Sequence, residues 1–296
     1  MSFKKDFMNF SVKYFGDIVV NYEKNFSGIR DNIRKANIKM TLRQYLSVAV
    51  LSSVIAFVVI TPFIGIIFGL VSGGIGGIIG GLIAGPFLGV GGAVGVFMFF
   101  YIYPSNKITK RRNNIDFNLP FATTYLSTVA GMGTPIAAIF RLLGEFDEYG
   151  EVSKEARKIA NDVYGFGADT EIALTRAAKR TPSEKFKDLL WGINSILTTG
   201  GDLKGFLREK ANTYMDDYRR QLDKFSDTLS LLVEMYITVV IVGSVFIMII
   251  TTIMSSLGTE PIVILTLQIA TVFLLLPISS MMFILIVKTV SPIENS

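Results

Sequence analysis

The sequence contains neither cysteine nor histidine among its 296 residues. Without cysteine the chain forms no disulfide, no thiolate metal site and no cysteine nucleophile. Without histidine it lacks the commonest general base and the commonest transition-metal ligand, which excludes histidine-based catalytic triads and zinc hydrolases. Neither G-x-x-x-x-G-K-[ST] nor G-x-G-x-x-G occurs among the 27 glycines, so a P-loop ATPase is excluded as well. We therefore expect no catalytic residue, no metal site and no cofactor.

Charge is absent from one long stretch of the chain. No Lys, Arg, Asp or Glu occurs between Gln44 and Asn106, in a protein with a mean hydropathy of +0.49. A membrane-spanning helix needs about 20 apolar residues, so this stretch predicts two spans, near residues 45–70 and 77–103, with a turn at 72–76. A second apolar block predicts two more spans, at residues 228–256 and 262–287, joined by a turn at 258–261.

Small residues line one face of the first apolar block. Glycine recurs at every fourth position, at Gly65, Gly69, Gly73, Gly77, Gly81, Gly85 and Gly89. Such spacing lets helix backbones approach closely. The glycines predict either a tight hairpin within the chain or a contact face for another protein subunit, and a turn near residues 72–76 favours the hairpin.

The N-terminal segment, residues 1–43, is basic and amphipathic. It carries nine Lys and Arg against four acids, and its aromatic and isoleucine residues recur every three or four positions. It contains no continuous apolar core of the kind that marks a signal peptide. This pattern fits an interfacial helix on anionic lipid, or a helix packed on the protein's own cytoplasmic part.

Residues 104–228 are of a different character, with 19 basic and 17 acidic residues and no alternating strand pattern. Helix starts are predicted at 118–120 and 134–135, turns at 131–133 and 165–167, and helix caps at Ser153 and Asp169. These signals predict an antiparallel bundle of about six helices.

The last two helices of this bundle form the hairpin around which the chain is organised. Thr181 is predicted to cap the first of them, with Pro182 at the first helical position and Glu184 closing a capping box. Gly200 and Gly201 form the structural turn, because glycine accepts the left-handed conformation at a helix end. Asp202 is expected to cap the second helix, which continues through Phe225 into the third span.

Charge distribution predicts the topology. Basic residues crowd the N-terminal segment and the cluster Lys107, Lys110, Arg111 and Arg112, whereas the hairpin tips near Gly74 and Gly258 carry none. The positive-inside rule then places both termini and the charged segment in the cytoplasm of a multi-pass protein of the cell membrane. The predicted segments are 1–43, basic N-terminal; 44–103, first transmembrane hairpin; 104–228, cytoplasmic bundle; 229–288, second transmembrane hairpin; and 289–296, short cytoplasmic tail.

One acid, Glu234, lies inside the second apolar block. An intramembrane acid is a functional candidate by default. Glu234 lies only seven residues past Asp227, so it is alternatively interpreted as a residue at the membrane interface. The net charge of +5 is distributed as expected for a membrane surface, and no nucleic-acid partner is predicted.

The order of these features resembles the type II secretion F-domain family, the membrane platform proteins of type IV pili, Tad pili and archaella, and in particular the archaeal platforms. The likeness covers roughly residues 38–256. It is carried by the segments IDFNLPF (115–121), EYGEVSKEA (148–156), RTPS (180–183) and GGDLK (200–204).

The resemblance implies a non-enzymatic platform that couples a hexameric cytoplasmic secretion ATPase to the extraction of pilin or archaellin subunits and filament assembly. Archaellum platforms usually carry two such domains and this chain carries one, which implies a homodimer or pairing with a second platform half. The alternative is a half-transporter or channel subunit that dimerises through the glycine-rich hairpin. Candidate ATPase contacts are the basic residues of the charged segment: Arg141, Lys154, Arg157, Lys158, Arg180, Lys185, Lys187, Lys204 and Arg208.

Overall fold

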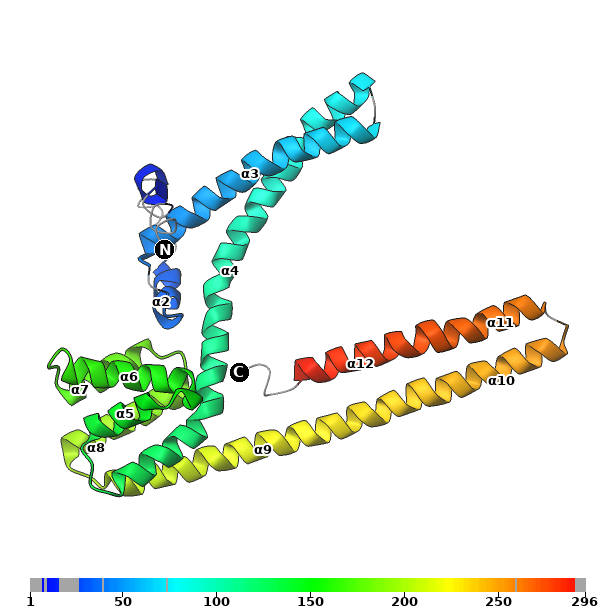
Figure 1. Cartoon of the computed structure of the whole chain (residues 1–296). Helices are drawn as coiled ribbons and strands as arrows, with labels where there is room; N and C mark the ends of the chain where they lie inside the picture. Colours follow the sequence, from blue (N-terminus) through cyan, green and yellow to red (C-terminus); the bar gives the residue numbers. More distant parts are fainter. Residues whose placement is uncertain are drawn as a thin grey trace. The chain divides into compact units, whose positions relative to one another are not determined.

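The computed structural model describes residue 7 and residues 10–15, 27–38, 40–72, 74–258 and 260–290. Every regular element in this part of the chain is a helix, and no strand occurs in it, so the predicted all-helical fold class is confirmed (Figure 1). The contacts divide the described residues into two compact units. One comprises those of 1–112 with Thr175–Asp188, and the other comprises Asn113–Leu174 with those of 189–296.

Four helices are long and apolar enough to cross a membrane, as predicted. Their bounds are Leu42–Ile64, Gly85–Ala130, Leu203–Ser256 and Pro261–Thr289. The first two belong to α3 (Leu42–Ser72) and α4 (Gly74–Ala130), and the break between these helices falls inside the turn predicted at 72–76. Most side chains in these spans are exposed in the single chain, as expected for surfaces that face lipid.

Helix α4 is one continuous element of 57 residues, although it contains Pro86, Pro104 and Pro120. The predicted helix start at 118–120 is therefore wrong. A proline removes the hydrogen bond to the carbonyl four residues earlier, and inside a membrane that carbonyl needs another donor. At Pro104 the freed carbonyl is that of Phe100, and the Tyr45 hydroxyl of α3 donates to it at 2.7 Å. The proline is thus accommodated by a neighbouring helix, a compensation that local sequence does not reveal.

In the described part of the N-terminal segment, helix α2 (Ser27–Lys35) packs on the start of α3. Ile29 and Ile33 are buried in a cluster with Leu42, Tyr45 and Leu46. The turn into α3 is a reciprocal capping box, since Thr41 and Gln44 each accept a hydrogen bond from the other's backbone N–H. The structure therefore shows α2 packed on the protein's own chain.

Two glycines of the four-residue series lie directly against α3. A Cβ on Gly85 would come within 2.8 Å of the Thr61 carbonyl oxygen, and a Cβ on Gly89 within 2.2 Å of the Thr61 hydroxyl. The close approach that the spacing predicts thus occurs inside the hairpin. Gly73 lies outside the described residues, as do the surroundings of Gly65, Gly69, Gly77 and Gly81.

Between the two apolar pairs, the end of α4 is followed by short helices and one long helix. They are α5 (Ile136–Glu145), the 3-10 turn η2 (Asp147–Tyr149), α6 (Glu151–Tyr164), α7 (Thr170–Arg180), α8 (Glu184–Thr199) and α9 (Leu203–Ile237). In the second unit, α4 buries Ile115, Leu119, Leu126 and Val129 at helical spacing. Helices α5, α6, α8 and α9 also bury apolar residues, among them Leu143, Ile159, Leu190 and Leu207.

The turns between these helices follow the glycine signals. Gly133, Gly167 and Gly200 all have positive φ, at 73°, 67° and 75°. Gly201 is not among the positive-φ residues, and a Cβ there would meet only ordinary contacts, the nearest at 3.6 Å from Ile196. The demand for glycine in this turn therefore rests on Gly200, because only that residue adopts the left-handed conformation.

Of the four predicted helix caps, Asp169 and Asp202 stand directly before their helices. The prediction of Ser153 is wrong, because α6 already begins at Glu151 and the Ser153 hydroxyl donates to the Phe146 carbonyl. The Asp169 carboxylate accepts from the Glu171 N–H at 3.2 Å, as expected. Helix α8 begins at Glu184 with Ser183 as its cap, since the Ser183 hydroxyl accepts from the Phe186 N–H at 3.1 Å. The prediction of Thr181 is wrong because that residue lies two residues before the actual cap. Asp202 precedes α9 as predicted, but its side chain makes no capping bond.

The second apolar pair contains two π-helical segments. Helix α9 continues through η3 (Thr238–Val242) into α10 (Gly243–Ser256), so the predicted extension of this helix into the third span is confirmed. Helix α11 (Pro261–Ala270) continues through η4 (Thr271–Leu275) into α12 (Leu276–Val290). The η4 segment ends two residues before Pro277, whose missing N–H disturbs the hydrogen bonds of that turn.

Candidate functional site

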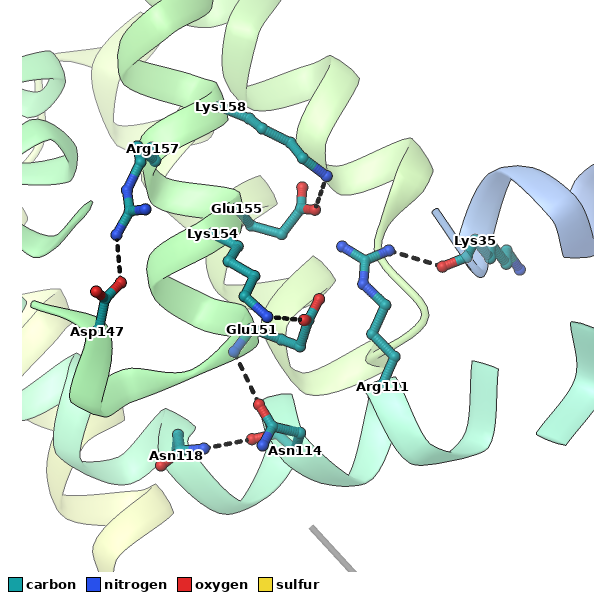
Figure 2. A network of polar contacts seen from close by, with 10 residues as sticks. All are labelled: Lys35, Arg111, Asn114, Asn118, Asp147, Glu151, Lys154, Glu155, Arg157 and Lys158. Carbon is teal, nitrogen blue, oxygen red and sulfur yellow. Dashed lines mark hydrogen bonds and ion pairs between the residues drawn. The ribbon is translucent and has the colours of Figure 1, made fainter. Parts of the chain in front are cut away.

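A network of polar contacts fixes helix α6 against α4. The Asn114 side-chain oxygen accepts a hydrogen bond from the Glu151 N–H at 2.8 Å, so a residue of α4 caps the start of α6 (Figure 2). Gly150, just before α6, has φ 58° and ψ −119°, and a Cβ there would lie 2.5 Å from the Asn114 oxygen. The Asn118 amide donates to the Asn114 carbonyl at 2.8 Å. Helix α6 therefore starts at a fixed place on α4.

Helices α5 and α6 pack closely against each other, and Arg157 holds them together where α5 ends. A Cβ on Gly144 would be 3.1 Å from the Arg157 backbone, so the helices touch there. Arg157 donates to the Gly144 carbonyl at 2.8 Å. It also pairs with Asp147 at 2.6 Å, as Figure 2 shows. A cation at the end of α5 complements the partial negative charge of its last carbonyls.

One acid in α6 is fully buried. Glu155 has no exposed side-chain surface and pairs with Lys158, one turn later, at 2.8 Å (Figure 2). A buried carboxylate is stable only when it is paired and hydrogen-bonded. Lys158 is thus part of the internal structure of α6 rather than a free surface charge.

A groove of about 570 Å³ lies at the end of α4, in the second unit. Two facing stripes line it, each at helical spacing. The α4 side contributes Thr124, Ser127, Thr128, Gly131 and Met132, and the α9 side contributes Lys204, Arg208, Ala211, Asn212 and Met215. The groove therefore combines hydroxyl and amide groups, two thioether side chains and two cations.

The charge of this groove is positive. Lys204 and Arg208 are both exposed, and no ion pair is found for either among the residues that the structure describes. The Lys204 side chain runs along the end of α4, with its Cε 3.5 Å from where a Gly131 Cβ would stand. No acidic residue lines the groove. It is suited to an acidic or polar protein segment, with the methionines offering adaptable apolar contact.

The structure brings together only two of the nine predicted contact residues. Three others have intrahelical or neighbouring partners: Lys154 pairs with Glu151 at 2.7 Å, Lys187 pairs with Glu184 at 2.9 Å, and Arg157 pairs with Asp147. Lys158 holds the buried Glu155, as described above.

The other three predicted contacts are also placed separately. Arg141 lies over the Tyr164 ring, 5.7 Å from its centroid. Arg180 ends α7, and Lys185 lies in the first turn of α8. Both have further polar or electrostatic interactions within the chain. Only Lys204 and Arg208 share a groove, and the hydroxyl stripe opposite them was not predicted from the sequence, although its three- and four-residue spacing is visible there.

No metal centre accompanies the groove. Among the described residues, no group of three or more acidic side chains could hold a metal ion. Glu234 is exposed on α9, inside the apolar length of that helix.

Comparison with known proteins gives a family match that includes the residues lining the groove. A family model described as type II secretion system (T2SS), protein F matches residues 122–251. An uncharacterized protein of Methanocaldococcus jannaschii is 30% identical over 136 residues, which are 46% of this chain and 23% of that protein.

Two further relatives are both named flagella accessory protein J. The one from Methanocaldococcus jannaschii is 28% identical over 137 residues, covering 46% of this chain and 24% of the relative. The one from Methanococcus voltae is 27% identical over 163 residues, covering 55% of this chain and 28% of the relative. The chain thus matches about a quarter of the length of each curated relative. No solved structure matches.

Proposed function

We propose that this chain, which belongs to the type II secretion system protein F family through residues 122–251, is a non-enzymatic membrane platform of a pilus-like or archaellum assembly machine. The observation that carries the proposal is the family domain itself, set between two pairs of apolar helices. The two relatives named flagella accessory protein J support a role in a filament system.

The platform lies in the cell membrane with both termini and residues 104–228 in the cytoplasm. The support is the charge distribution, because four basic residues follow the second span at 107–112 and none flanks either hairpin tip. Four spans return the chain to the side on which it starts. The five predicted segments, with boundaries at 43, 103, 228 and 288, are part of this proposal.

A cytoplasmic secretion ATPase docks on the positive groove formed by α4 and α9. Support comes from the two exposed cations, Lys204 and Arg208, and from the position of the groove at the start of the long helix that enters the third span. The helix from Leu203 to Ser256 has 54 residues. At 1.5 Å per residue it is about 80 Å long, so a displacement at its first turns is carried into the membrane. Pilin or archaellin subunits are the load, and a second copy or a second platform half completes the assembly.

A half-transporter or channel is less well supported. Its subunit interface would be the glycine face of the first hairpin. The surfaces of Gly85 and Gly89, however, are already in contact with Thr61 of the same chain. These two glycines are therefore not available to a second subunit.

Affinity purification of the full-length protein from native membranes tests the proposal. We expect the cognate ATPase and filament subunits to co-purify. The double reversal Lys204→Glu with Arg208→Glu should weaken ATPase binding roughly tenfold or more at low salt, and less at high salt, because the contact is electrostatic. Arg219→Glu is the matched control, since Arg219 is an exposed cation of the same helix outside the groove.

Two results would contradict the proposal. Normal filaments in a deletion strain, together with no ATPase in the purified complex, would exclude the platform function. Equal weakening by the groove variant and by Arg219→Glu would keep the platform function but remove the groove as the docking site.

A further inference from the structure

A second cleft, unrelated to the groove, lies in the first unit. Its volume is about 260 Å³, and it is formed by α2, the end of α7 and the start of α8. Its lining side chains are mostly charged: Asp31, Arg34, Lys35, Lys179, Glu184 and Lys187, with Ala178 and Thr181. The cleft therefore holds four cations and two acids within a small volume.

Two more cations, Arg111 and Arg112, interact with residues that line this cleft. Arg111 of α4 has 6% of its surface exposed and donates to the Lys35 carbonyl at 2.7 Å, at the C-terminal end of α2 (Figure 2). That bond holds the end of α2 in place and satisfies one of its last carbonyls. Arg112 follows in the sequence. A buried arginine thus positions α2, so the cleft wall is anchored rather than loosely apposed.

The pKa of Glu184 reflects the positive charge around this cleft. Its pKa is lowered from the ordinary value, first because Lys187 hydrogen-bonds to the carboxylate and attracts it. Lys35 and Arg112 lower this pKa further. Three separate helices therefore present positive charge to one carboxylate at the mouth of the cleft.

The cleft lies close to the end of the first hairpin. Lys35 precedes Leu42, where the first span begins, by seven residues. Ile29 and Ile33 of the same α2 helix pack on Leu42 and Tyr45. The polar headgroup region extends roughly 5–8 Å beyond each side of the hydrocarbon core, so groups at this level reach phosphates of the membrane surface.

We propose that this cleft binds a phosphate group, held by Arg34, Lys35, Lys179 and Lys187 on the side of the protein that meets the membrane surface. Lysine and arginine are the side chains that bind phosphate, either as point charges or as bidentate donors. The group belongs either to an anionic lipid or to a free phosphate compound, since both present the same oxygens. The Glu184 carboxylate lies among the same cations, so it competes with the phosphate group for them.

The test uses the full-length protein in a non-ionic detergent and titration calorimetry with three probes. These are dioctanoyl phosphatidic acid, dioctanoylglycerol, which has the same chains without phosphate, and inorganic phosphate. We expect Lys179→Gln to weaken binding of a phosphate-bearing probe about fivefold, the effect of one basic charge near an anionic surface. Glu184→Gln should strengthen the same binding. Arg176→Gln is the matched control, because Arg176 is an exposed cation of α7 that does not line the cleft.

The lipid and free-phosphate arms distinguish the two sources. Variant-sensitive binding of phosphatidic acid alone assigns the cleft to a lipid headgroup, and variant-sensitive binding of inorganic phosphate assigns it to a soluble phosphate. The proposal is overturned if Lys179→Gln and Arg176→Gln change binding equally, or if dioctanoylglycerol binds as tightly as phosphatidic acid. Matching circular dichroism melts for the three variants show that lost binding is not lost folding.

Discussion

Replacement of Gly150 by alanine attacks the junction between α4 and α6 at its tightest point. Gly150 has φ 58° and ψ −119°, a conformation that residues with a side chain rarely adopt. Holding a non-glycine residue in such a region costs about 1–3 kcal/mol. The new Cβ would also stand 2.5 Å from the Asn114 side-chain oxygen, so Asn114 must move.

The displacement of Asn114 removes the cap of α6. Its bond to the Glu151 N–H is then lost, and loss of a helix N-cap costs about 1 kcal/mol. The two effects together predict a loss of about 2–4 kcal/mol in the free energy of unfolding for Gly150→Ala. Asn114→Ala alone should cost about 1 kcal/mol, since it removes only the cap. Asn114→Asp should be close to neutral, because a carboxylate accepts the same bond and favours a helix start.

Thermal melting of the full-length protein in detergent measures these effects. Trp191 is the only tryptophan and lies in α8, so its fluorescence reports on the helices between the two hairpins. A loss of 1 kcal/mol lowers Tm by about 2–4 °C in a protein of 150–250 residues. Gly150→Ala should therefore lower Tm by about 5–15 °C.

The double variant is the sharper test of the mechanism. With Asn114→Ala already present, the cap is gone and the clash disappears, so Gly150→Ala should cost less there than in the wild type. A Gly150→Ala protein that melts within about 1 °C of wild type would refute the backbone argument. Strict additivity in the double variant would refute the proposed contact with Asn114.

Two other substitutions isolate single features. Gly200→Ala should destabilise the α8–α9 turn by about 1 kcal/mol, because φ is 75° there, whereas Gly201→Ala should be nearly neutral, and fluorescence-monitored melts compare the two. Equal effects would mean that the turn does not depend on the left-handed residue. Tyr45→Phe should cost about 1–3 kcal/mol, because it leaves the Phe100 carbonyl without the donor that Pro104 makes necessary. Thermal unfolding in detergent, followed by circular dichroism, measures this loss, and a variant as stable as wild type would mean that another group satisfies the carbonyl.

Local signals in the sequence predict those features whose cause is local. The apolar runs locate the four spans, and the glycine turns at Gly133, Gly167 and Gly200 are correct because a positive φ is a property of one residue. The helix start predicted at Pro120 fails for the opposite reason. Whether a proline ends a helix depends on what satisfies the freed carbonyl. Pro104 frees the Phe100 carbonyl, and its donor is Tyr45, which lies 55 residues from Phe100 in the sequence.

The candidate site shows the same division. Lys204 and Arg208 are among the nine predicted contacts, but the sequence does not separate them from cations with internal roles. Part of that separation was available, since Lys154, Lys158 and Lys187 each follow an acid by three residues, the spacing of helical ion pairs. The bond from Arg157 to the Gly144 carbonyl was not available, because it depends on how closely α5 and α6 pack. The same holds for the cap that Asn114 provides.

The π-helical segment η3 gives the long helix two different phases. A π-helical turn takes up one extra residue, and each residue of an α-helix advances the side-chain direction by roughly 100°. Side chains of α10 are therefore rotated by about that angle from where uninterrupted counting from α9 would place them. The direction in which α9 faces the groove therefore does not predict, by simple residue counting, the direction in which α10 faces the lipid. Cysteine cross-linking along this helix is convenient because the chain has no native cysteine. Positions that share one helix face have to be counted separately before Thr238 and after Val242.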